Sequence, residues 1–298
     1  MSERTHGYQC TGCRAPWRTV KWKGPCPDCG RVYNIISKYL SDNDDEEDLT
    51  IADGVAVPLS DVKVKDIPRI STGVTGLDKI LGGTPTDANG SGSEGLVPGS
   101  VVLLCGPPGS GKSTLLTMAF RNIAQKRLPV LYVSGEEPLA DIKRRAERLG
   151  KVPRHFQVLT ETDLDTILEQ ADQIRPKVIV IDSIQTVDSD EDLLPGSSSA
   201  IEAGINELRR YAQSERIAII VIAHVTKDGS ISGPRRLEHM VDASFYFEPG
   251  QFKDHRWLRC LGKNRYGRAP ASTRFEMGEG VLKDCYEEDE QKQETEAV

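Results

Sequence analysis

The sequence lacks a long hydrophobic run. No stretch of its 298 residues approaches the roughly 18 apolar residues that a membrane-spanning helix needs. Residues 1–9 are polar, so the apolar segment of a secretory signal peptide is missing there too. We also find no internal repeat, which argues against a solenoid. From these absences we expect a cytoplasmic protein with no membrane partner.

Cysteine is scarce, with seven in the chain, and three of the seven are scattered. The other four stand in two pairs, Cys10-x-x-Cys13 and Cys26-x-x-Cys29, with 12 residues between the pairs. Two such turns supply four thiolates, which can form a closed tetrahedral shell around Zn²⁺. Two redox motifs are the alternative, although a redox C-x-x-C is expected once and near a βαβ unit. The spacing favours a structural zinc finger.

Charge is distributed unevenly behind the net value of −7. Residues 42–48 carry −6 and residues 284–298 another −6, whereas residues 1–41 carry +5 and residues 49–283 are neutral. The acidity therefore belongs to two segments of a composition that is typical of disorder. It neither requires nor excludes a nucleic-acid partner.

Basic and aromatic side chains surround the four cysteines, and they are Arg14, Trp17, Arg18, Lys21, Trp22 and Lys23. Such a surface could follow nucleic acid by charge and stacking. The two tryptophans could instead form the small core of the module.

The most informative stretch is GPPGSGKS at residues 106–113, which matches the phosphate-binding pattern G-x-x-x-x-G-K-[ST] in full. Its glycines allow consecutive backbone N–H groups to close around a phosphate. Lys112 would reach the β- and γ-phosphates, and the Ser113 hydroxyl would complete a Mg²⁺ shell. The nucleotide-binding residues that we expect are Gly106, Gly109, Ser110, Gly111, Lys112, Ser113 and Thr114.

The chain around this loop has the alternating pattern of an α/β domain. Buried parallel strands are expected at 101–104, 130–134, 158–160, 178–182 and 217–224, and helices at 113–125, 138–149, 163–174 and 199–214. Alternation of this kind gives βαβ crossovers and a mostly parallel sheet with helices on both faces. Further strands, at 243–248, 257–261 and 272–277, are expected to form a partly antiparallel edge.

Composition divides the chain into four parts. We predict a zinc finger at 1–33, an acidic linker at 34–66, the α/β nucleotide-binding domain at 67–283 and an acidic disordered tail at 284–298. Within the third part, residues 84–95 are polar, rich in glycine and serine and aperiodic, which indicates a flexible surface insertion.

Ionisable side chains follow several of the expected strands. Asp182 ends an apolar strand, at the position where P-loop proteins orient Mg²⁺ through a water. Glu136 and Glu137 follow an earlier strand, where a carboxylate could polarise an attacking water. The alternative, an acidic first helical turn, fits Glu137 better. His224 ends a later strand, and its position alone leaves a structural role open.

A series of motifs then identifies a family. The motifs are GVTGLD at 73–78, the phosphate-binding loop, YVSGEE at 132–137, IDSIQT at 181–186, HVTKDG at 224–229, GPRRLEHMVD at 233–242 and KNRYG at 263–267. In this order they closely resemble the bacterial RadA (Sms) family, RecA-fold ATPases of DNA repair and recombination that carry an N-terminal zinc finger. The last motif combined with the four-cysteine finger is the most specific part of the resemblance.

The resemblance implies roles around the nucleotide. Glu136 would activate the water, His224 would sense the γ-phosphate, and Lys263 and Arg265 would reach the nucleotide of a neighbouring subunit. The catalytic set is then Lys112, Glu136, Asp182, His224, Lys263 and Arg265. Ser113 and Asp182, the latter through a water, would hold Mg²⁺.

It also implies a partner. A loop at 226–238 would face DNA, with Lys227, Arg235 and Arg236 as phosphate contacts. The family forms hexameric rings that act as DNA-dependent, helicase-like ATPases on single-stranded or branched DNA, with ATP, Mg²⁺ and Zn²⁺ as cofactors. Recombinases or replication proteins are the candidate protein partners.

Two departures from the family bear on assembly and DNA binding. Typical members continue into a Lon-protease-like C-terminal domain where this sequence has its acidic tail, and the segment 84–95 interrupts a normally short turn. A regulatory or scaffold ATPase, whose ring assembles proteins without DNA, is the alternative function. A small-molecule phosphotransferase is a weaker one, because it needs neither a zinc module nor an Arg265 that acts in trans.

Overall fold

The computed structural model describes residues 5–10, 26–29, 35–40, 68–84, 93–189, 193–194, 196–224, 234–278 and 281–286, and at 5–10, 35–40 and 234–235 it describes the backbone alone. The chain separates into two compact units, Met1–Asp66 and Ile67–Val298.

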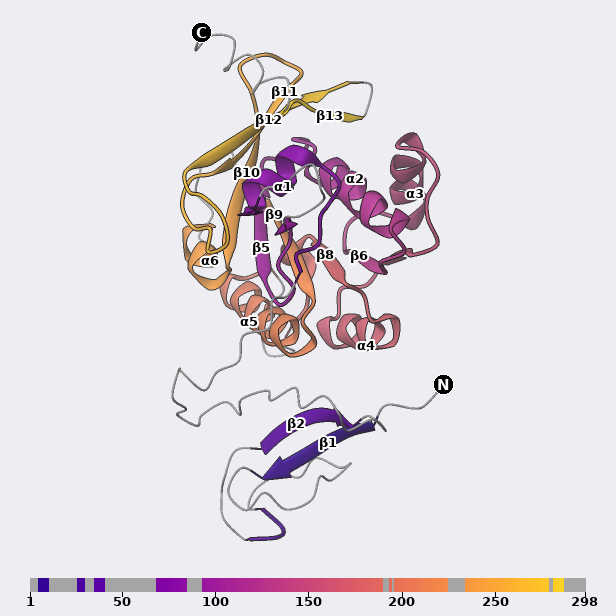
Figure 1. Cartoon of the computed structure of the whole chain (residues 1–298), viewed down its shortest axis with the longest axis vertical. Coiled ribbons are helices and arrows are strands. Elements are labelled where there is room, and N and C mark those ends of the chain that lie inside the picture. The colour runs from indigo at the N-terminus through magenta and orange to yellow at the C-terminus, as the bar shows by residue number, and fades with distance from the viewer. Residues whose placement is uncertain are drawn as a thin grey trace. The chain divides into compact units, whose positions relative to one another are not determined.

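The first unit contains a two-stranded antiparallel ladder (Figure 1). Strand β1 (Thr5–Cys10) pairs with β2 (Ile35–Leu40), and Cys10 stands opposite Ile35. Strand β2 lies inside the range 34–66 that the composition suggested to be a linker. Its pairing with β1 joins residues 35–40 to the cysteine-containing module. The rest of that range, residues 41–66, lies outside the described residues.

The second unit is built on a nine-stranded sheet of order β13-β12-β11-β10-β5-β9-β8-β6-β7. The six strands from β10 to β7 run parallel, and β11, β12 and β13 extend the β10 edge in antiparallel fashion. Their bounds are β5 Val101–Gly106, β6 Val130–Ser134, β7 Phe156–Leu159, β8 Val178–Asp182, β9 Ala218–His224, β10 Ala243–Pro249, β11 His255–Cys260, β12 Ala271–Met277 and β13 Leu282–Asp284.

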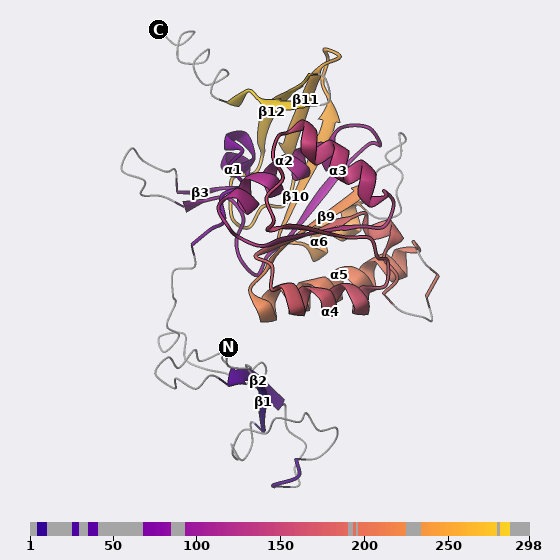
Figure 2. The same ribbon diagram turned by 90° about the vertical axis from the view of Figure 1, so that its right-hand side faces the viewer.

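Helices cover both faces of this sheet (Figure 2). Helices α1 (Thr75–Leu81), α2 (Lys112–Gln125) and α3 (Leu139–Arg148) lie over one face, and α4 (Leu164–Ile174) and α5 (Ser198–Glu215) over the other. Helix α6 (Pro234–Met240) precedes β10, and a 3₁₀ turn, η2 (Ile184–Thr186), follows β8.

The strands are buried on both faces, because alternate side chains enter two separate apolar clusters. On β5, Val102 and Leu104 pack in the cluster of α1, α2 and α3, whereas Val101, Leu103 and Cys105 pack in the cluster of α4, α5 and α6. Two-sided burial is what near-continuous apolar strands indicate. The predicted α/β class with a mostly parallel sheet is confirmed.

The predicted insertion begins and ends in a short ladder. Strand β3 (Gly83–Thr84) pairs with β4 (Ser93–Glu94), and residues 85–92 between them lie outside the described residues. In the described part of the chain we find no helix with the length and hydropathy to cross a bilayer.

Candidate nucleotide-binding and catalytic site

The phosphate-binding loop joins β5 to α2. Gly111, the residue before α2, has a left-handed backbone with φ 103° and ψ 14°. A side chain with a Cβ rarely adopts this conformation, so the backbone of the loop requires glycine at position 111. Helix α2 begins at Lys112, and the first N–H groups of a helix have no acceptor within it. The loop and the helix start together form an anion-binding cradle.

Lys112 lies buried in this cradle. Its Nζ donates to the carbonyl oxygens of Gly106 at 2.8 Å and Pro107 at 3.1 Å. Burial lowers the pKa of the Lys112 ammonium, and the charge of Asp182 opposes this effect. The buried Ser110 hydroxyl has no hydrogen-bond partner among the described residues. A buried ammonium and an unsatisfied hydroxyl at a helix start fit a polyanionic ligand such as the triphosphate of ATP.

Neighbouring strands end at the same edge of the sheet as this loop. In the parallel pairs, Gly106 of β5 stands opposite His224 of β9, and Ser134 of β6 opposite Asp182 of β8. The Ser113 Oγ donates to the Asp182 Oδ2 at 2.8 Å. The fold therefore brings the loop serine and the strand-end carboxylate together. A hydroxyl and a carboxylate are oxygen donors of the kind that Mg²⁺ takes, so this pair fits the metal.

Glu136 lies beside His224 at that edge. The Ser183 Oγ donates to the Glu136 Oε1 at 2.7 Å, and the His224 Nε2 lies 3.5 Å from the same oxygen. Both ring nitrogens of His224 are buried without a hydrogen-bond partner among the described residues. Leaving buried polar atoms unpaired is costly, so this geometry fits a site that receives a polar ligand.

Ser183 and Gln185 were not identified from the sequence as site residues. The Gln185 side-chain amide donates to the His224 backbone oxygen at 3.3 Å. Both residues stand in the IDSIQT motif directly after Asp182. Their position after a strand that ends in a carboxylate was the available signal.

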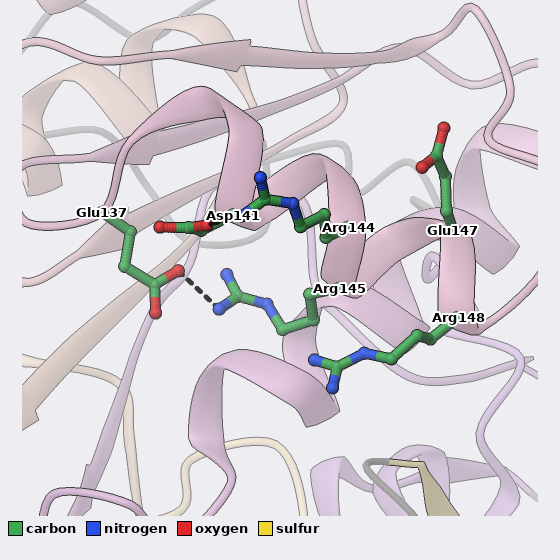
Figure 3. A pocket seen from close by; sticks show the side chains of 6 residues that line it. All are labelled: Glu137, Asp141, Arg144, Arg145, Glu147 and Arg148. Carbon is green, nitrogen blue, oxygen red and sulfur yellow. Dashed lines mark hydrogen bonds and ion pairs between the residues drawn. The ribbon is translucent and has the colours of Figure 1, made fainter.

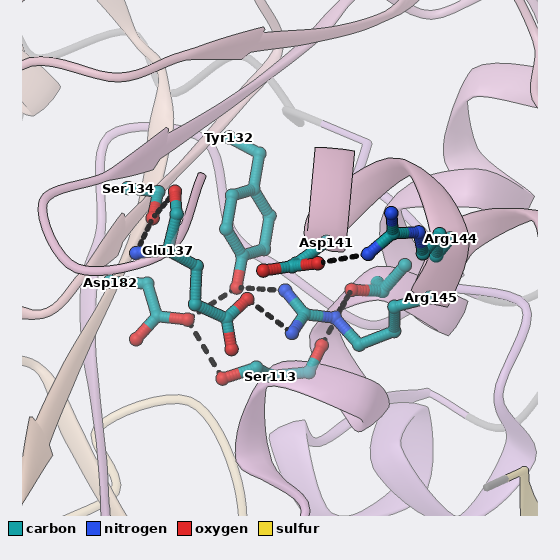
Figure 4. A network of polar contacts seen from close by, with 9 residues as sticks. Ser113, Tyr132, Ser134, Glu137, Asp141, Arg144, Arg145 and Asp182 are labelled. Atoms are coloured by element: carbon teal, nitrogen blue, oxygen red, sulfur yellow. Dashed lines mark hydrogen bonds and ion pairs between the residues drawn. The ribbon is translucent and has the colours of Figure 1, made fainter. Parts of the chain in front are cut away.

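The Glu137 carboxylate contacts a different element from the Glu136 carboxylate. Its carboxylate forms an ion pair with Arg145 of α3, and its backbone N–H donates to the Ser134 Oγ at 3.0 Å. Figure 4 shows the Glu137 and Arg145 side chains pointing toward one another. The two adjacent carboxylates therefore have different neighbours: Glu136 contacts Ser183, which follows β8, and His224 of β9, whereas Glu137 contacts Arg145 of α3.

The structure does not bring Arg265 to the nucleotide site of its own chain. The Arg265 Nη1 donates to the Asp242 Oδ1 at 2.9 Å, and the Asp242 Oδ2 accepts the N–H of Val101 at 2.9 Å. Val101 begins β5, and Gly106 ends it. At about 3.3 Å per residue, these ends lie roughly 17 Å apart. Arg265 is therefore at the opposite edge of the sheet from the phosphate-binding loop.

Lys263 lies at this opposite edge too, and its Nζ donates to the His239 carbonyl oxygen at 2.9 Å. Burial and the charge of Arg265 lower the pKa of Lys263. Two other residues of the motif anchor the segment: the Asn264 Nδ2 donates to the Ile80 oxygen at 2.9 Å, and Gly267 packs against the backbone at Gly82. The Arg265 side chain is half exposed at 52%.

Of the residues predicted to contact DNA, the structure describes the side chain of Arg236 alone. The Arg236 Nε forms an ion pair with the Glu202 Oε1 of α5 at 2.8 Å, and the Arg236 side chain is 73% exposed. Lys227 and the side chain of Arg235 lie outside the described residues.

The cysteine module is described in one of its two turns. Cys26 is buried, and the backbone N–H of Asp28 donates to the Cys26 Sγ at 3.4 Å. Cys13 and the side chain of Cys10 lie outside the described residues, and within the described ones no group of three or more potential metal ligands is found.

The fold and this site define a class. A phosphate-binding loop after β5, a carboxylate at the end of β8, and the strand order β7-β6-β8-β9-β5 are those of a P-loop ATPase domain of the RecA-like kind. Residues 84–230 match the family described as an AAA domain.

Similar proteins are more specific. The chain is 38% identical over 288 residues to the DNA repair protein RadA of Pseudomonas aeruginosa and 35% identical over 289 residues to that of Halalkalibacterium halodurans. Each alignment covers 95% of this chain and 60% of the relative. The RadA of Bacillus subtilis is 35% identical over the same shares. The chain is thus similar to RadA proteins along nearly its whole length, and it spans about 60% of the length of these relatives.

Proposed function

We propose that the chain hydrolyses ATP and couples hydrolysis to movement on single-stranded or branched DNA in recombination and repair. The observation that carries the proposal is the placement of Glu136, whose Oε1 accepts from Ser183 and faces His224 at the edge of the phosphate-binding loop. A carboxylate fixed there can accept the proton of an attacking water. The name of the relatives, DNA repair proteins, supports the DNA part.

Each residue then has a task. Lys112 balances charge on the β- and γ-phosphates, and Glu136 takes up a proton while Ser183 keeps its carboxylate from rotating. His224 donates a ring N–H to the γ-phosphate. The Ser113 hydroxyl and, through a water, Asp182 would hold Mg²⁺, which neutralises phosphate charge when bound.

We also propose that chains assemble into a hexameric ring in which Lys263 and Arg265 serve the neighbouring nucleotide. The support is geometric: both residues lie at the sheet edge that faces away from their own phosphate-binding loop. A second copy is therefore needed for either side chain to reach a nucleotide.

Salt dependence tests the DNA part of the proposal. Binding of a fluorescent single-stranded oligonucleotide should weaken with salt, and Lys227→Ala, Arg235→Ala and Arg236→Ala should each lower the log–log slope by roughly 0.7. Arg210→Ala is a matched control, because Arg210 is also 73% exposed and paired with a glutamate. Its slope should equal that of the unaltered protein.

The ion pair of Arg236 with Glu202 favours the alternative function, since a paired arginine has less charge to offer a phosphate. Absence of any DNA affinity at low salt, in protein that binds ATP, would support a scaffold ATPase and contradict a DNA-dependent one.

We propose that Cys10, Cys13, Cys26 and Cys29 bind one structural Zn²⁺. Removal of the metal with a chelator should unfold the N-terminal module, because zinc supplies on the order of 10–16 kcal/mol to small finger peptides. Metal analysis and circular dichroism before and after chelation provide the measurement. Substoichiometric zinc in metal-replete protein, with a disulfide between Cys10 and Cys13, would contradict zinc and favour the redox alternative.

A further inference from the structure

A series of hydrogen-bonded side chains extends from the proposed Mg²⁺ site into the protein (Figure 4). Tyr132 of β6 is fully buried, and its hydroxyl forms a hydrogen bond with the Asp182 Oδ2. A carboxylate accepts hydrogen bonds and a phenol O–H can donate one, so Tyr132 donates to Asp182. The same carboxylate oxygen accepts from Ser113.

Arg145 of α3 continues the chain beyond Tyr132. Its side chain is 9% exposed. The Nη2 donates to the Tyr132 hydroxyl at 3.4 Å, the Nε donates to the Thr117 Oγ1 at 3.0 Å, and the guanidinium carbon lies 5.9 Å from the tyrosine ring centroid. The Nη1 holds Glu137, the neighbour of the proposed catalytic glutamate.

This chain of contacts reaches the surface along α3. Arg145 lines an open groove whose other residues are Glu137, Asp141, Arg144, Glu147 and Arg148 (Figure 3). Inside the protein, Arg145 of α3 contacts Tyr132 of β6, and Tyr132 contacts Asp182 of β8. Asp182 in turn accepts from Ser113 of α2. A side chain on a surface helix is thus connected to the carboxylate at the metal site.

We propose that Tyr132 is a positioning residue for the Mg²⁺ site, and that Arg145 positions the hydroxyl of Tyr132. Both hydrogen bonds that the described residues donate to the Asp182 carboxylate fall on Oδ2. They fix the carboxylate so that Oδ1 remains for a water of the metal shell. The inference rests on the proposed nucleotide function. Partners that orient a metal-binding carboxylate typically change metal affinity about 10–100-fold.

The test replaces Tyr132 by phenylalanine, which removes the hydroxyl and keeps the ring. Protein is mixed with a fluorescent, non-hydrolysable ATP analogue and titrated with Mg²⁺. In Tyr132→Phe the Mg²⁺ concentration for half-maximal response should rise about 10–100-fold, while binding of the analogue without Mg²⁺ stays as in the unaltered protein.

Tyr246→Phe is the matched control. The Tyr246 hydroxyl also forms a hydrogen bond with a carboxylate, that of Glu238, but among the described side chains no hydrogen bond joins this pair to Asp182 or Ser113. Loss of this hydrogen bond should lower thermal stability and leave the Mg²⁺ titration unchanged. Arg145→Met is the second variant. Its Mg²⁺ concentration for half-maximal response should also rise, but by less than in Tyr132→Phe, and this variant serves as the test if Tyr132→Phe does not fold.

An unchanged Mg²⁺ titration in the folded variants, with thermal stability lowered as in the control, would show that the contacts only stabilise the fold. That outcome would overturn the inference and leave the proposed function intact. If the unaltered protein bound the analogue with no response to Mg²⁺, the proposed function would fail, and the role of Tyr132 with it.

Discussion

Arg265→Ala should lower the rate of ATP hydrolysis by roughly 10³–10⁵-fold, which is the contribution of arginine fingers to phosphoryl transfer. Lys112→Ala should also be inactive, because it lacks the ammonium that balances phosphate charge. A mixture of the two variants should regain part of the activity. The first variant keeps a working phosphate-binding loop, and the second still offers Arg265, so some mixed interfaces are complete.

The contact with Asp242 requires a further control. Asp242 is buried, and Arg265→Ala removes its cationic partner, which by itself destabilises the sheet edge. Arg265→Lys keeps a charge near Asp242 but loses the planar fork of the guanidinium. We expect Arg265→Lys to unfold at nearly the same temperature as the unaltered protein. Its rate of ATP hydrolysis should nevertheless stay far below that of the unaltered protein.

Mixing separates the two roles of Arg265. A subunit that is inactive because it is unstable gains nothing from a Lys112→Ala neighbour, whereas a subunit that lacks only a trans contribution does. Absence of recovery after proven subunit exchange, together with an undiminished melting temperature, would contradict the trans assignment.

Glu136→Gln should lower hydrolysis by about 10²–10⁴-fold and leave ATP binding intact, because the amide cannot accept the proton of the attacking water. The amide can still accept the hydrogen bond of Ser183 and so keeps the loop in place. Steady-state phosphate release and equilibrium binding of a fluorescent ATP analogue measure the two quantities.

Glu137→Gln provides the comparison, since it makes the same chemical change one residue along the chain. Its carboxylate faces Arg145, so the substitution weakens an ion pair and should reduce hydrolysis by much less than Glu136→Gln. Hydrolysis at the parental rate in Glu136→Gln, with a large loss in Glu137→Gln, would reverse the assignment of the two glutamates.

The sequence predicts those parts of the site whose functional residues stand close together in one short segment of the chain. The phosphate-binding loop is such a segment, and so are the apolar strands that end at Asp182 and His224. Parallel strands have their carboxyl ends at one edge, so predicting the strands also predicted that these two residues would lie near the loop.

The contacts that the sequence does not predict join residues far apart in the chain. Tyr132 lies 50 residues before Asp182 in the sequence, within a strand otherwise composed of apolar residues and a terminal serine. Arg145 stands among other charged residues of α3, and it becomes buried only when that helix packs near β6. Neither position carries a local pattern that distinguishes it from a core tyrosine or a solvated arginine.

The short helix α1 was missed for a similar reason. Its seven residues are few for a recognisable helical periodicity. It is stabilised instead by Asp78, which accepts hydrogen bonds from Thr72 and Ser71 in the segment before the helix. The family motif GVTGLD contains the carboxylate, but its acceptor role depends on the folded turn.

The most direct measurement of the central claim is the steady-state rate of ATP hydrolysis with and without single-stranded DNA, with Glu136→Gln as the blank. We predict that DNA raises the rate of the unaltered protein and that the glutamine variant stays near the background in both conditions. A rate above the blank that is the same with and without DNA, at low salt and with the nucleotide site saturated, would contradict a DNA-dependent ATPase.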